Sequence, residues 1–235
     1  MKISLIHPSR QRAIIAFDTC QYWLSNASKE NEIEYILSCD ATDPLLKDYQ
    51  DLFASHTVIV SDNKNVVDAS NNGAKYATGK IFILVSDDFE CYPNWDLDIV
   101  AEFKDKYCKL LKTFDGFQGW IVTIPIMDRA FYLHNDYIYY PEYTHMFCDT
   151  DLTHKAELEG NLIVRNDIVF KHNHYSVDGG AQKDELNVKA DNTWATGKTL
   201  YLERMKNKFG LHPSTNVLNI CADAKGHIKW IKSNT

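Results

Sequence analysis

A strand that ends in two aspartates most strongly constrains how this chain can fold. Residues 81–85 (IFILV) are all apolar, and Ser86, Asp87 and Asp88 follow them directly. A continuous apolar run is typical of a central strand that helices cover on both faces, whereas a half-exposed strand alternates apolar and polar residues. We therefore expect a layered α/β protein with this strand in the middle of its sheet.

Short apolar runs alternate with longer amphipathic segments on both sides of that strand, as they do in α/β layer architectures. We expect strands at 3–7, 33–39, 57–60, 80–85, 118–124, 162–170 and 217–221, and helices at 12–28, 44–53, 62–77, 95–112, 149–158 and 191–209. Asp62 is expected to cap the third helix and Gly79 to end it. The first half then reads β-α-β-α-β-α-β, a Rossmann-like unit.

The size and charge of the chain limit its class. Its 235 residues suffice for one substantial core, so we expect a single domain. The net charge of −7 argues against a broad basic surface, and no nucleic-acid partner is expected. The first apolar run is too short for a secretory signal, and no apolar stretch approaches the ~20 residues of a transmembrane segment. The six cysteines form no CxxC pair, so we expect a reducing, cytoplasmic location.

Polar residues follow three of the expected strands. Residues 8–10, Asp40 and residues 86–88 come after the first, second and fourth strands, and such strand ends meet at the ligand-binding edge of a Rossmann-like sheet. Two adjacent carboxylates, Asp87 and Asp88, are costly there unless a cation neutralises them. A divalent metal does so and accepts phosphate oxygens as further ligands. The alternative is that Asp88 caps a turn or the following helix.

The stretch around this motif resembles the GT-A glycosyltransferases, particularly the family 2-like group. Residues 71–88 (NNGAKYATGKIFILVSDD) contain an Asn-x-Gly helix, an Ala-x-Gly stop, an apolar strand and a variant of the Asp-x-Asp motif, and residues 92–95 (YPNW) also fit. The resemblance extends over about residues 1–190. It implies a mixed central sheet flanked by helices, with a nucleotide-binding half (1–95), an acceptor half (96–200) and a packed C-terminal tail (201–235).

The resemblance assigns donor-binding roles to the first half. Asp88 would bind Mn²⁺ or Mg²⁺, and Asp87 would contact the ribose or the sugar, although Ser-Asp-Asp departs from a strict Asp-x-Asp. Residues 7–12 (HPSRQR) resemble the family turn that wraps the nucleotide base. The implied nucleotide-binding residues are Pro8, Ser9, Arg10, Arg12, Asp40, Asn72 and Asp87. The residues alone also allow Arg10 and Arg12 to be exposed charges at a helix start, and Asp43 reads as a helix cap.

Two acidic residues open the helix expected at 149–158. Asp149 and Asp151 suit the first turn of a helix, and Asp149 or Thr150 also suits its cap. The family places its general base in a similar Asp-x-Asp-Leu pattern, which puts the base at Asp149 and leaves Asp151 in reserve. Cys148 replaces the acidic residue usual before the base. An inverting transfer, which we favour, needs a carboxylate to deprotonate the acceptor hydroxyl; in a retaining transfer Asp149 would orient the acceptor instead.

A His-x-His pair follows the strand expected at 162–170. His172 and His174 would point to one side of the chain and could bind a metal. In many GT-A enzymes a late histidine completes the metal shell, which makes His172 the first choice and His174 the second. Residues 178–180 (DGG) are expected to form a loop over the diphosphate, and Asp184 is of interest by proximity.

Residues 125–147 are rich in tyrosine and histidine and lack regular periodicity. They would face the acceptor, because aromatic rings stack on sugar rings. The residues concerned are Arg129, Tyr132, His134, Tyr137, Tyr139, Tyr140, Tyr143 and His145. A flap of the hydrophobic core or an oligomer contact would explain the same composition.

The resulting hypothesis is a metal-dependent glycosyltransferase. It would move a sugar from a nucleotide-diphosphate donor, with UDP favoured by the habit of the family, to a hydroxyl of a glycan or glycoconjugate. One alternative is a sugar nucleotidyltransferase, but the first loop lacks the glycines that cradle a triphosphate. Another is a non-catalytic nucleotide-sugar or glycan-binding module on the same fold, which fold alone does not exclude.

Overall fold

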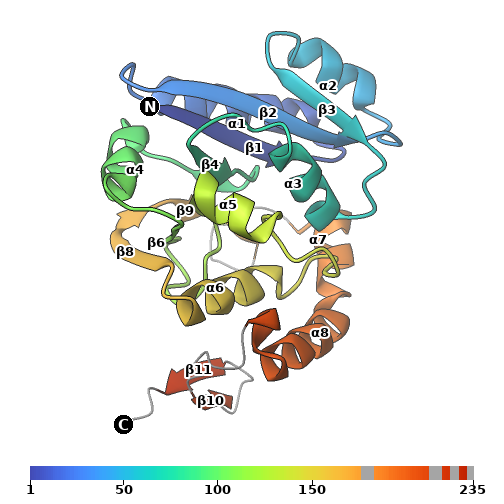
Figure 1. The fold of residues 1–235 in the computed structure, drawn as a ribbon. Helices are drawn as coiled ribbons and strands as arrows, with labels where there is room; N and C mark the ends of the chain where they lie inside the picture. Colours follow the sequence, from blue (N-terminus) through green and yellow to red (C-terminus); the bar gives the residue numbers. More distant parts are fainter. Residues whose placement is uncertain (176–182, 212–218, 223–227, 232–235) are drawn as a thin grey trace.

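A seven-stranded mixed sheet forms the centre of the protein (Figure 1). The computed structural model describes residues 1–175, 183–211, 219–222 and 228–231. The strand order is β3-β2-β1-β4-β7-β6-β8, and β7 alone runs antiparallel to both of its neighbours. The strands are β1 (Lys2–Pro8), β2 (Glu32–Asp40), β3 (Thr57–Ser61), β4 (Ile81–Leu84), β6 (Leu110–Phe114), β7 (Ile126–Asp128) and β8 (Leu162–Val169). The expected mixed α/β fold is confirmed.

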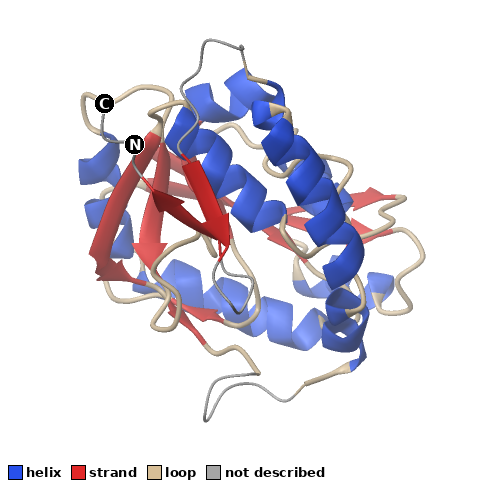
Figure 2. Cartoon of the chain, turned by 90° about the horizontal axis from the view of Figure 1, so that it is seen from below, coloured by secondary structure: helices blue, strands red, loops and turns tan. Residues whose placement is uncertain are grey.

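Helices cover both faces of this sheet (Figure 2). One hydrophobic core contains α1 (Ala13–Asn26), α2 (Leu46–Leu52) and α4 (Trp95–Phe103), and the other contains α3 (Val66–Ala74), α5 (Arg129–Asn135), α6 (Cys148–Leu158) and α8 (Trp194–Lys206). Side chains that alternate along a strand serve opposite cores: on β1, Leu5 packs with α1, and Ile6 packs with α3. The continuous apolar run of β4 is therefore buried on both faces, as expected.

Short elements complete the description. β5 (Phe89–Glu90) and β9 (Lys171–His172) pair as a separate two-stranded sheet, and so do β10 (Asn219–Ala222) and β11 (Ile228–Ile231). α7 (Glu185–Asp191) precedes α8, and a 3₁₀ turn (Lys208–Gly210) follows it. Of the strand expected at 217–221, residues 217 and 218 lie outside the described part of the chain. Within the described part, no helix is both long and apolar enough to cross a membrane.

The first half follows the expected β-α-β-α-β-α-β order, with two corrections around α3. Asn65, not Asp62, caps this helix, and its side chain accepts a hydrogen bond from Asp68 N at 3.0 Å. Gly79 does not end the helix, which stops at Ala74. Gly79 instead lets the chain approach β1 closely, because a Cβ at this position would lie 2.8 Å from Ser4 N.

The second half departs from the expected pattern. The helix expected at 95–112 ends at Phe103, and Asp105 and Cys108 turn the chain in left-handed conformations with φ of 59° and 55°. The apolar residues 110 and 111 therefore belong to β6 and not to a last helical turn. The strand expected at 118–124 is wrong, because these residues form an irregular loop whose Val122 N donates to Thr153 Oγ1 at 2.8 Å.

The helix expected at 191–209 corresponds to α8 and the 3₁₀ turn after it, and α8 begins three residues later than expected, at Trp194. A separate helix, α7, ends at Asp191, and Thr193 Oγ1, between the two helices, accepts a hydrogen bond from Met146 N at 3.1 Å. Gly197 then brings α8 against the backbone of residue 146, since a Cβ there would lie 2.2 Å from Met146 O. Tertiary contacts with the 146–147 loop therefore decide where this helix begins.

Candidate active site

The expected site residues of the first half gather at one edge of the sheet. β1, β2 and β4 run parallel, with Ile3 paired to both Ile33 and Ile81. Their carboxyl ends therefore bring the loop after Pro8, Asp40 and the 86–88 segment together. β6 and β8 are also parallel to each other, and their register shifts between Thr113 and Phe114, so that Phe114 pairs with Val169. This shift leads the chain after β8 along the end of β6 to the same edge.

Asp88 and His172 meet at this edge. His172 Nε2 lies 3.0 Å from Asp88 Oδ2, and Ser86 Oγ donates to Asp88 Oδ1 at 2.6 Å. The imidazole ring is stacked on Phe89 with centroids 4.1 Å apart and an interplanar angle of 16°. Backbone pairing of Phe89 with His172 in the β5–β9 sheet holds the two side chains in this arrangement.

The charges of this pair support each other. Burial opposes ionisation of both groups, but the imidazolium and the Ser86 hydroxyl lower the pKa of Asp88 to about 2. The carboxylates of Asp115 and Asp88 likewise outweigh burial and raise the pKa of His172 to about 9. At neutral pH the metal-free pair is therefore an imidazolium facing a carboxylate.

The same two atoms fit a divalent cation. A separation of 3.0 Å is about that of adjacent ligands around an octahedral ion with bonds of about 2.1 Å. No group of three or more His, Cys, Asp or Glu side chains in the described residues is arranged to hold an ion. Mg²⁺ sites commonly take only one or two protein ligands and complete their shell with water and substrate phosphates. The donor set thus suits an ion that arrives with a phosphate.

His174 lies beside this pair, next to His172. Its ring centroid is 5.1 Å from that of His172 and 4.1 Å from that of Tyr175. Burial, together with the charge of His172, lowers the pKa of His174. It stays a candidate ligand of second rank. Residues 178–180, expected to form a loop over the diphosphate, lie outside the described residues.

Asp87 points away from Asp88 toward the first strand. Its Oδ1 lies 2.9 Å from His7 Nε2 and its Oδ2 lies 3.5 Å from Arg12 Nη1. His7 Nδ1 in turn contacts Tyr35 Oη at 2.6 Å. Arg12 also forms an ion pair with Asp184, which caps α7. The structure therefore brings Asp87, Arg12 and Asp184 together, with Asp184 bound to the site through its ion pair with Arg12.

Asp40 is paired with Arg10 at the end of β2. Arg10 Nη1 lies 2.9 Å from Asp40 Oδ2, while Thr42 N donates to Oδ1 at 2.7 Å. Burial opposes the charge, but the hydrogen bonds from Thr42 and the charge of Arg10 lower the pKa of Asp40. Asp40 is therefore ionised beside the guanidinium of Arg10, on the rim of the sheet edge.

The first loop is fixed by contacts with α2. Tyr49 Oη lies 2.8 Å from Ser9 Oγ and accepts a hydrogen bond from Arg12 N at 2.9 Å. Asp43 is not the cap of α2, because Leu45 is its N-cap and makes no side-chain cap hydrogen bond; Asp43 instead accepts from Gln11 N at 2.7 Å and from Leu45 N at 2.8 Å and so joins this loop to the start of α2. These contacts hold the loop in place, including Gln11, whose φ of 57° is in the left-handed region that usually favours glycine.

Asn72 lies on α3, on the side of the sheet edge next to β3. It donates to Asn63 Oδ1 at 2.8 Å, and Asn63 donates to Cys39 O at 2.9 Å. Gly73 packs directly on the sheet, because a Cβ there would lie 2.9 Å from Ile6 Cγ2. The Asn-x-Gly helix is thus held close to the ends of β1 and β2, and Asn72 is connected to the end of β2 through Asn63.

Asp149 and Asp151 occupy different environments at the start of α6. Asp149 is partly exposed, and Thr150 N donates to its Oδ1 at 2.6 Å. Desolvation outweighs that hydrogen bond and raises the pKa of Asp149. The exposed His145 lies within the electrostatic reach of both Asp149 and Asp88. Asp149 therefore combines access with a raised pKa, the combination that a general base needs.

Asp151 is engaged by other side chains. It is 2% exposed and accepts from Arg204 Nε at 2.6 Å, from Arg204 Nη2 at 3.1 Å and from Tyr143 Oη at 3.0 Å. The Arg204 guanidinium also covers the Tyr140 ring at 3.3 Å from its centroid. These contacts join α6 to α8 and leave Asp151 little access to a substrate.

Sequence reasoning missed Asp115. This residue follows β6 and is 1% exposed, and its Oδ2 lies 3.7 Å from His172 Nδ1. A carboxylate after an apolar run was the signal that identified Asp40 and Asp88. The signal was hidden here because residues 110–112 were assigned to a helix.

Many of the aromatic residues expected to face the acceptor belong to the core. Tyr132, Tyr139 and Tyr143 are buried in the hydrophobic core that contains α3, α5 and α6. His134 instead lies 3.0 Å from Glu159 Oε1, and Arg129 donates to Ala77 O at 3.1 Å. Much of the aromatic surface of residues 125–147 is therefore part of the hydrophobic core, as the core-flap alternative predicts.

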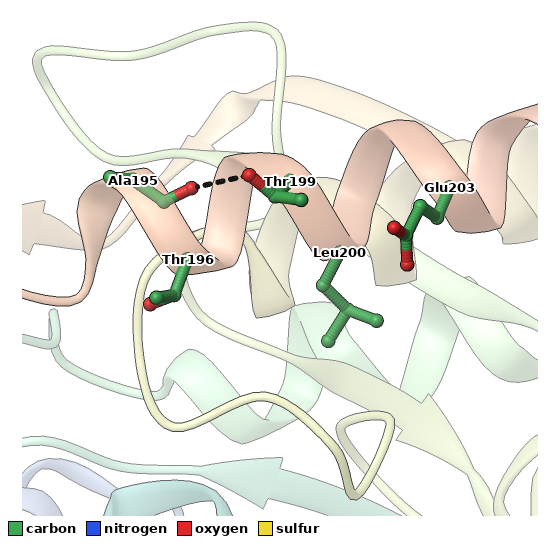
Figure 3. Close-up of a pocket in the computed structure, with 5 residues that line it drawn as sticks. All are labelled: Ala195, Thr196, Thr199, Leu200 and Glu203. Carbon is green, nitrogen blue, oxygen red and sulfur yellow. Dashed lines mark hydrogen bonds between the residues drawn. The ribbon is translucent and has the colours of Figure 1, made fainter.

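A cavity of about 430 Å³ opens beside the two strand-end aspartates. Its lining combines one face of α1 with the segment after β4: Ile15, Asp18, Thr19, Tyr22, Asp87, Asp88, Phe89, Glu90 and Asn173. Figure 3 shows a second hollow, of about 340 Å³, along α8. It is lined by Ala195, Thr196, Thr199, Leu200 and Glu203, and none of the residues expected to bind the metal or the nucleotide is among them, whereas the first cavity contacts both Asp87 and Asp88. We therefore place the candidate site at the sheet edge.

A comparison with protein families agrees with this geometry. The family model described as glycosyl transferase family 2 matches residues 29–151, which is more than half of the chain. The chain belongs to glycosyl transferase family 2. The matched region includes β4, Asp87, Asp88 and Asp149, and the resemblance inferred from residues 71–88 is confirmed. No curated protein matches this family 2 chain by sequence.

Solved structures share the GT-A fold of this family 2 protein. The mannosyltransferase PcManGT from Pyrobaculum calidifontis, in complex with GDP-Man and Mn²⁺, has a TM-score of 0.64 at 11% identity over 91% of this chain, which spans 65% of that enzyme. Glucosyl-3-phosphoglycerate synthase from Mycobacterium tuberculosis, with Mn²⁺, UDP and phosphoglyceric acid, has a TM-score of 0.55 at 10% identity, covering 98% and 87% of the two chains. S. aureus TarS with UDP has a TM-score of 0.51 at 20% identity, covering 72% and 59%. At these identities the likeness establishes the fold.

Proposed function

We propose that this protein transfers a sugar from a nucleotide-diphosphate donor to a hydroxyl group in a reaction that needs Mn²⁺ or Mg²⁺. The observation that carries the proposal is the 3.0 Å separation of Asp88 Oδ2 and His172 Nε2 at the carboxyl edge of the sheet. An oxygen and a nitrogen donor at this spacing suit a divalent ion that shares phosphate oxygens with its ligand. When bound, the ion supplies positive charge that offsets the charge of the leaving diphosphate.

The neighbouring side chains support a nucleotide at the same edge. Arg12 beside Asp87 offers a cation to the phosphates, and the fixed loop of residues 8–12 lies next to Asp40. Asp40, with its lowered pKa, is an ionised acceptor for the hydroxyls of a ribose or the N–H of a base. Structural relatives have been solved with GDP-Man or UDP, and we favour a UDP-sugar as the first donor to test.

Asp149 is the proposed general base. It lies at the accessible start of α6, its raised pKa makes it a better proton acceptor than an ordinary carboxylate, and Asp151 is occupied by Arg204. In an inverting transfer, Asp149 takes the proton of the acceptor hydroxyl as that oxygen forms the new bond to the anomeric carbon, while the bond from this carbon to the phosphate oxygen breaks and the nucleoside diphosphate leaves from the opposite face. A hydroxyl of a glycan or glycoconjugate is the proposed acceptor.

Calorimetric titration of UDP, with and without Mn²⁺, tests the metal assignment. Wild type should bind UDP more tightly with Mn²⁺, and Asp88→Ala should lose that difference because one of two protein ligands is gone. Asp98→Ala is a matched control, since this aspartate on α4 contacts Tyr92 at 2.9 Å and lies outside the site. Equal UDP affinity in wild type with and without Mn²⁺ would contradict the proposal.

Turnover separates an enzyme from a binding module on the same fold. Incubation with UDP-sugars and Mn²⁺ should release UDP, and more rapidly when an acceptor is added. Tight binding of the nucleotide-sugar without any release of UDP would instead support the non-catalytic alternative.

A further inference from the structure

Asp115 is held at the end of β6 by backbone donors. Its Oδ1 accepts hydrogen bonds from Phe117 N at 2.7 Å and from Gln118 N. Both donors belong to the loop that follows the strand, so the orientation of the carboxylate is set by the backbone. The other oxygen, Oδ2, therefore points in a defined direction.

Asp115 Oδ2 is buried, and within the described residues no donor reaches it with full hydrogen-bond geometry, although the nearby Thr123 hydroxyl helps to lower the pKa of Asp115. A buried carboxylate oxygen without a donor is costly, and a nearby N–H lowers that cost. The charged group that faces it is the imidazole of His172, whose Nδ1 lies 3.7 Å away. This separation is longer than a hydrogen bond but within the range of a strong charge interaction in a buried site.

The ring of His172 is constrained on its other sides as well. His172 N donates to Asp115 O at 2.8 Å, one ring face stacks on Phe89 at 4.1 Å, and Nε2 faces Asp88 at 3.0 Å. With the ring plane and both edges fixed, Nδ1 faces Asp115 while Nε2 faces Asp88. The ring therefore lies between two carboxylates.

We propose that Asp115 is a positioning residue that keeps the proton of neutral His172 on Nδ1 and so leaves Nε2 free to bind the divalent metal beside Asp88. This inference rests on the proposed metal site. Metal-binding histidines usually donate their second ring N–H to a carboxylate or carbonyl, which fixes the tautomer and makes the ligating nitrogen more basic. Asp115 is such a carboxylate, and it lies outside the Asp87-Asp88 motif.

The substitution Asp115→Asn places a hydrogen-bond donor where Asp115 offers His172 an acceptor. Phe117 N and Gln118 N still require an acceptor, so the amide oxygen of Asn stays with them. The amide NH₂ then faces Nδ1 and favours the tautomer with its proton on Nε2, where the metal should bind. We expect Mn²⁺ affinity to fall by about 10–100-fold.

Asp115→Ala distinguishes positioning from structure. Ala removes the acceptor of both backbone donors but places no donor against Nδ1, so the productive tautomer stays accessible. A positioning role predicts that Asn weakens Mn²⁺ binding more than Ala does. A merely structural role predicts the opposite order, because only Ala leaves the loop donors without a partner.

Electron paramagnetic resonance of Mn²⁺ with UDP measures both the affinity and the ligand. Wild type should show a nitrogen coupling from the imidazole, His172→Ala should lack it, and Asp115→Asn should lose most of it. Asp96→Asn is the matched control, since Asp96 is also fully buried and accepts from Ser28 N at 2.6 Å but lies outside the site. Its Mn²⁺ affinity and nitrogen coupling should equal those of wild type.

The outcomes separate this inference from the proposed function. Nitrogen coupling and Mn²⁺ affinity that are unchanged in Asp115→Asn would overturn the role of Asp115 and leave the metal site intact. A wild type without Mn²⁺ binding or without nitrogen coupling would overturn both. Weaker binding in Asp115→Ala than in Asp115→Asn would also overturn the positioning role.

Discussion

Asp88 and His172 are 84 residues apart in the chain, and their side chains meet at 3.0 Å. Asp88 follows the central strand of the sheet, whereas His172 arrives after β8, the last strand on the far edge. The small β5–β9 sheet joins the two segments by pairing Phe89 with His172. The proposed metal site therefore depends on the register of an element of only two residues per strand, and any change that shifts β9 should affect it.

Binding of Mn²⁺ should depend strongly on pH. His172 must lose its proton to bind a metal, and the pKa of this residue is raised to about 9, whereas Asp88, with a pKa of about 2, stays ionised. The apparent affinity should therefore fall about tenfold for each pH unit below 9, because protons compete for Nε2. Titration of Mn²⁺ at pH 6, 7 and 8 measures the slope.

His172→Gln provides the control for this pH dependence. Gln supplies an oxygen ligand that does not titrate, so Mn²⁺ binding by this variant should be weaker and nearly flat over the same range. A wild-type affinity that does not change between pH 6 and 8 would show that His172 does not bind the ion.

Asp149→Asn should abolish transfer without weakening the donor complex. The amide cannot accept the acceptor proton, so kcat should fall by about 10²–10⁴-fold, the usual contribution of a general base. UDP affinity with Mn²⁺ should stay at the wild-type value, because no donor-binding contact is removed. Initial rates with an identified acceptor, together with UDP titrations, test both parts. Normal transfer by Asp149→Asn and none by a folded Asp151→Asn would move the base to Asp151.

The transfer rate should also decline at a higher pH than an ordinary aspartate would impose. A base acts only when it is ionised, and burial raises the pKa of Asp149, so activity is present above this pKa and is lost as pH falls through it. The profile of kcat against pH at saturating Mn²⁺ reports the group in the substrate complex. An acid limb at or below the usual aspartate pKa of about 3.9 would contradict the assignment.

The residues that could be predicted share a local signal. Asp40 and Asp88 follow apolar runs that are strands, and parallel pairing alone brings the ends of such strands together. Asp115 carries the same signal, but residues 110–111 continue the apolar spacing of α4 and so mimic a last helical turn. The helix ends at a turn in which Asp105 and Cys108 have positive φ. Because neither residue is a glycine, the sequence does not signal this turn.

Other features depend on contacts between distant segments. The pairing of Asp151 with Arg204 joins residues 53 positions apart, and no local pattern distinguishes it from the exposed charge of a first helical turn. The break before α8 likewise depends on Thr193 and Gly197 packing on residue 146. The intervening residues 191–193 (DNT) are weak helix formers, and these tertiary contacts then fix where α8 begins.

Arg204→Met should destabilise the protein strongly. Asp151 is 2% exposed, and its carboxylate would keep only Tyr143 as a donor. Breaking a buried ion pair from one side typically costs about 3–5 kcal/mol, because the remaining charge is buried without a partner. The free energy of unfolding from urea titration is the measurement. Lys47→Met, which removes an exposed pair with Asp51, should change it little.

The double variant Asp151→Leu with Arg204→Met tests whether the unpaired charge of Asp151 causes that loss of stability. Removing both charges leaves no buried carboxylate unpaired, so much of the stability lost in Arg204→Met should return. A double variant as unstable as the single one would show that packing of the Arg204 side chain on Tyr140, and not the charge of Asp151, is what α8 contributes.

Gly79→Ala should destabilise the sheet at the edge opposite the site. The added Cβ would lie 2.6 Å from Ser4 Oγ and 2.8 Å from Ser4 N, and the second contact is with backbone that cannot rotate away. β1 and β4 would have to separate, at a cost of about 1–3 kcal/mol as for other overpacked positions. Gly119→Ala is the control, because its nearest neighbour is Phe114 Cδ2 at 3.9 Å. If urea titration gives the two variants the same stability, the close approach of Gly79 to β1 does not constrain the fold.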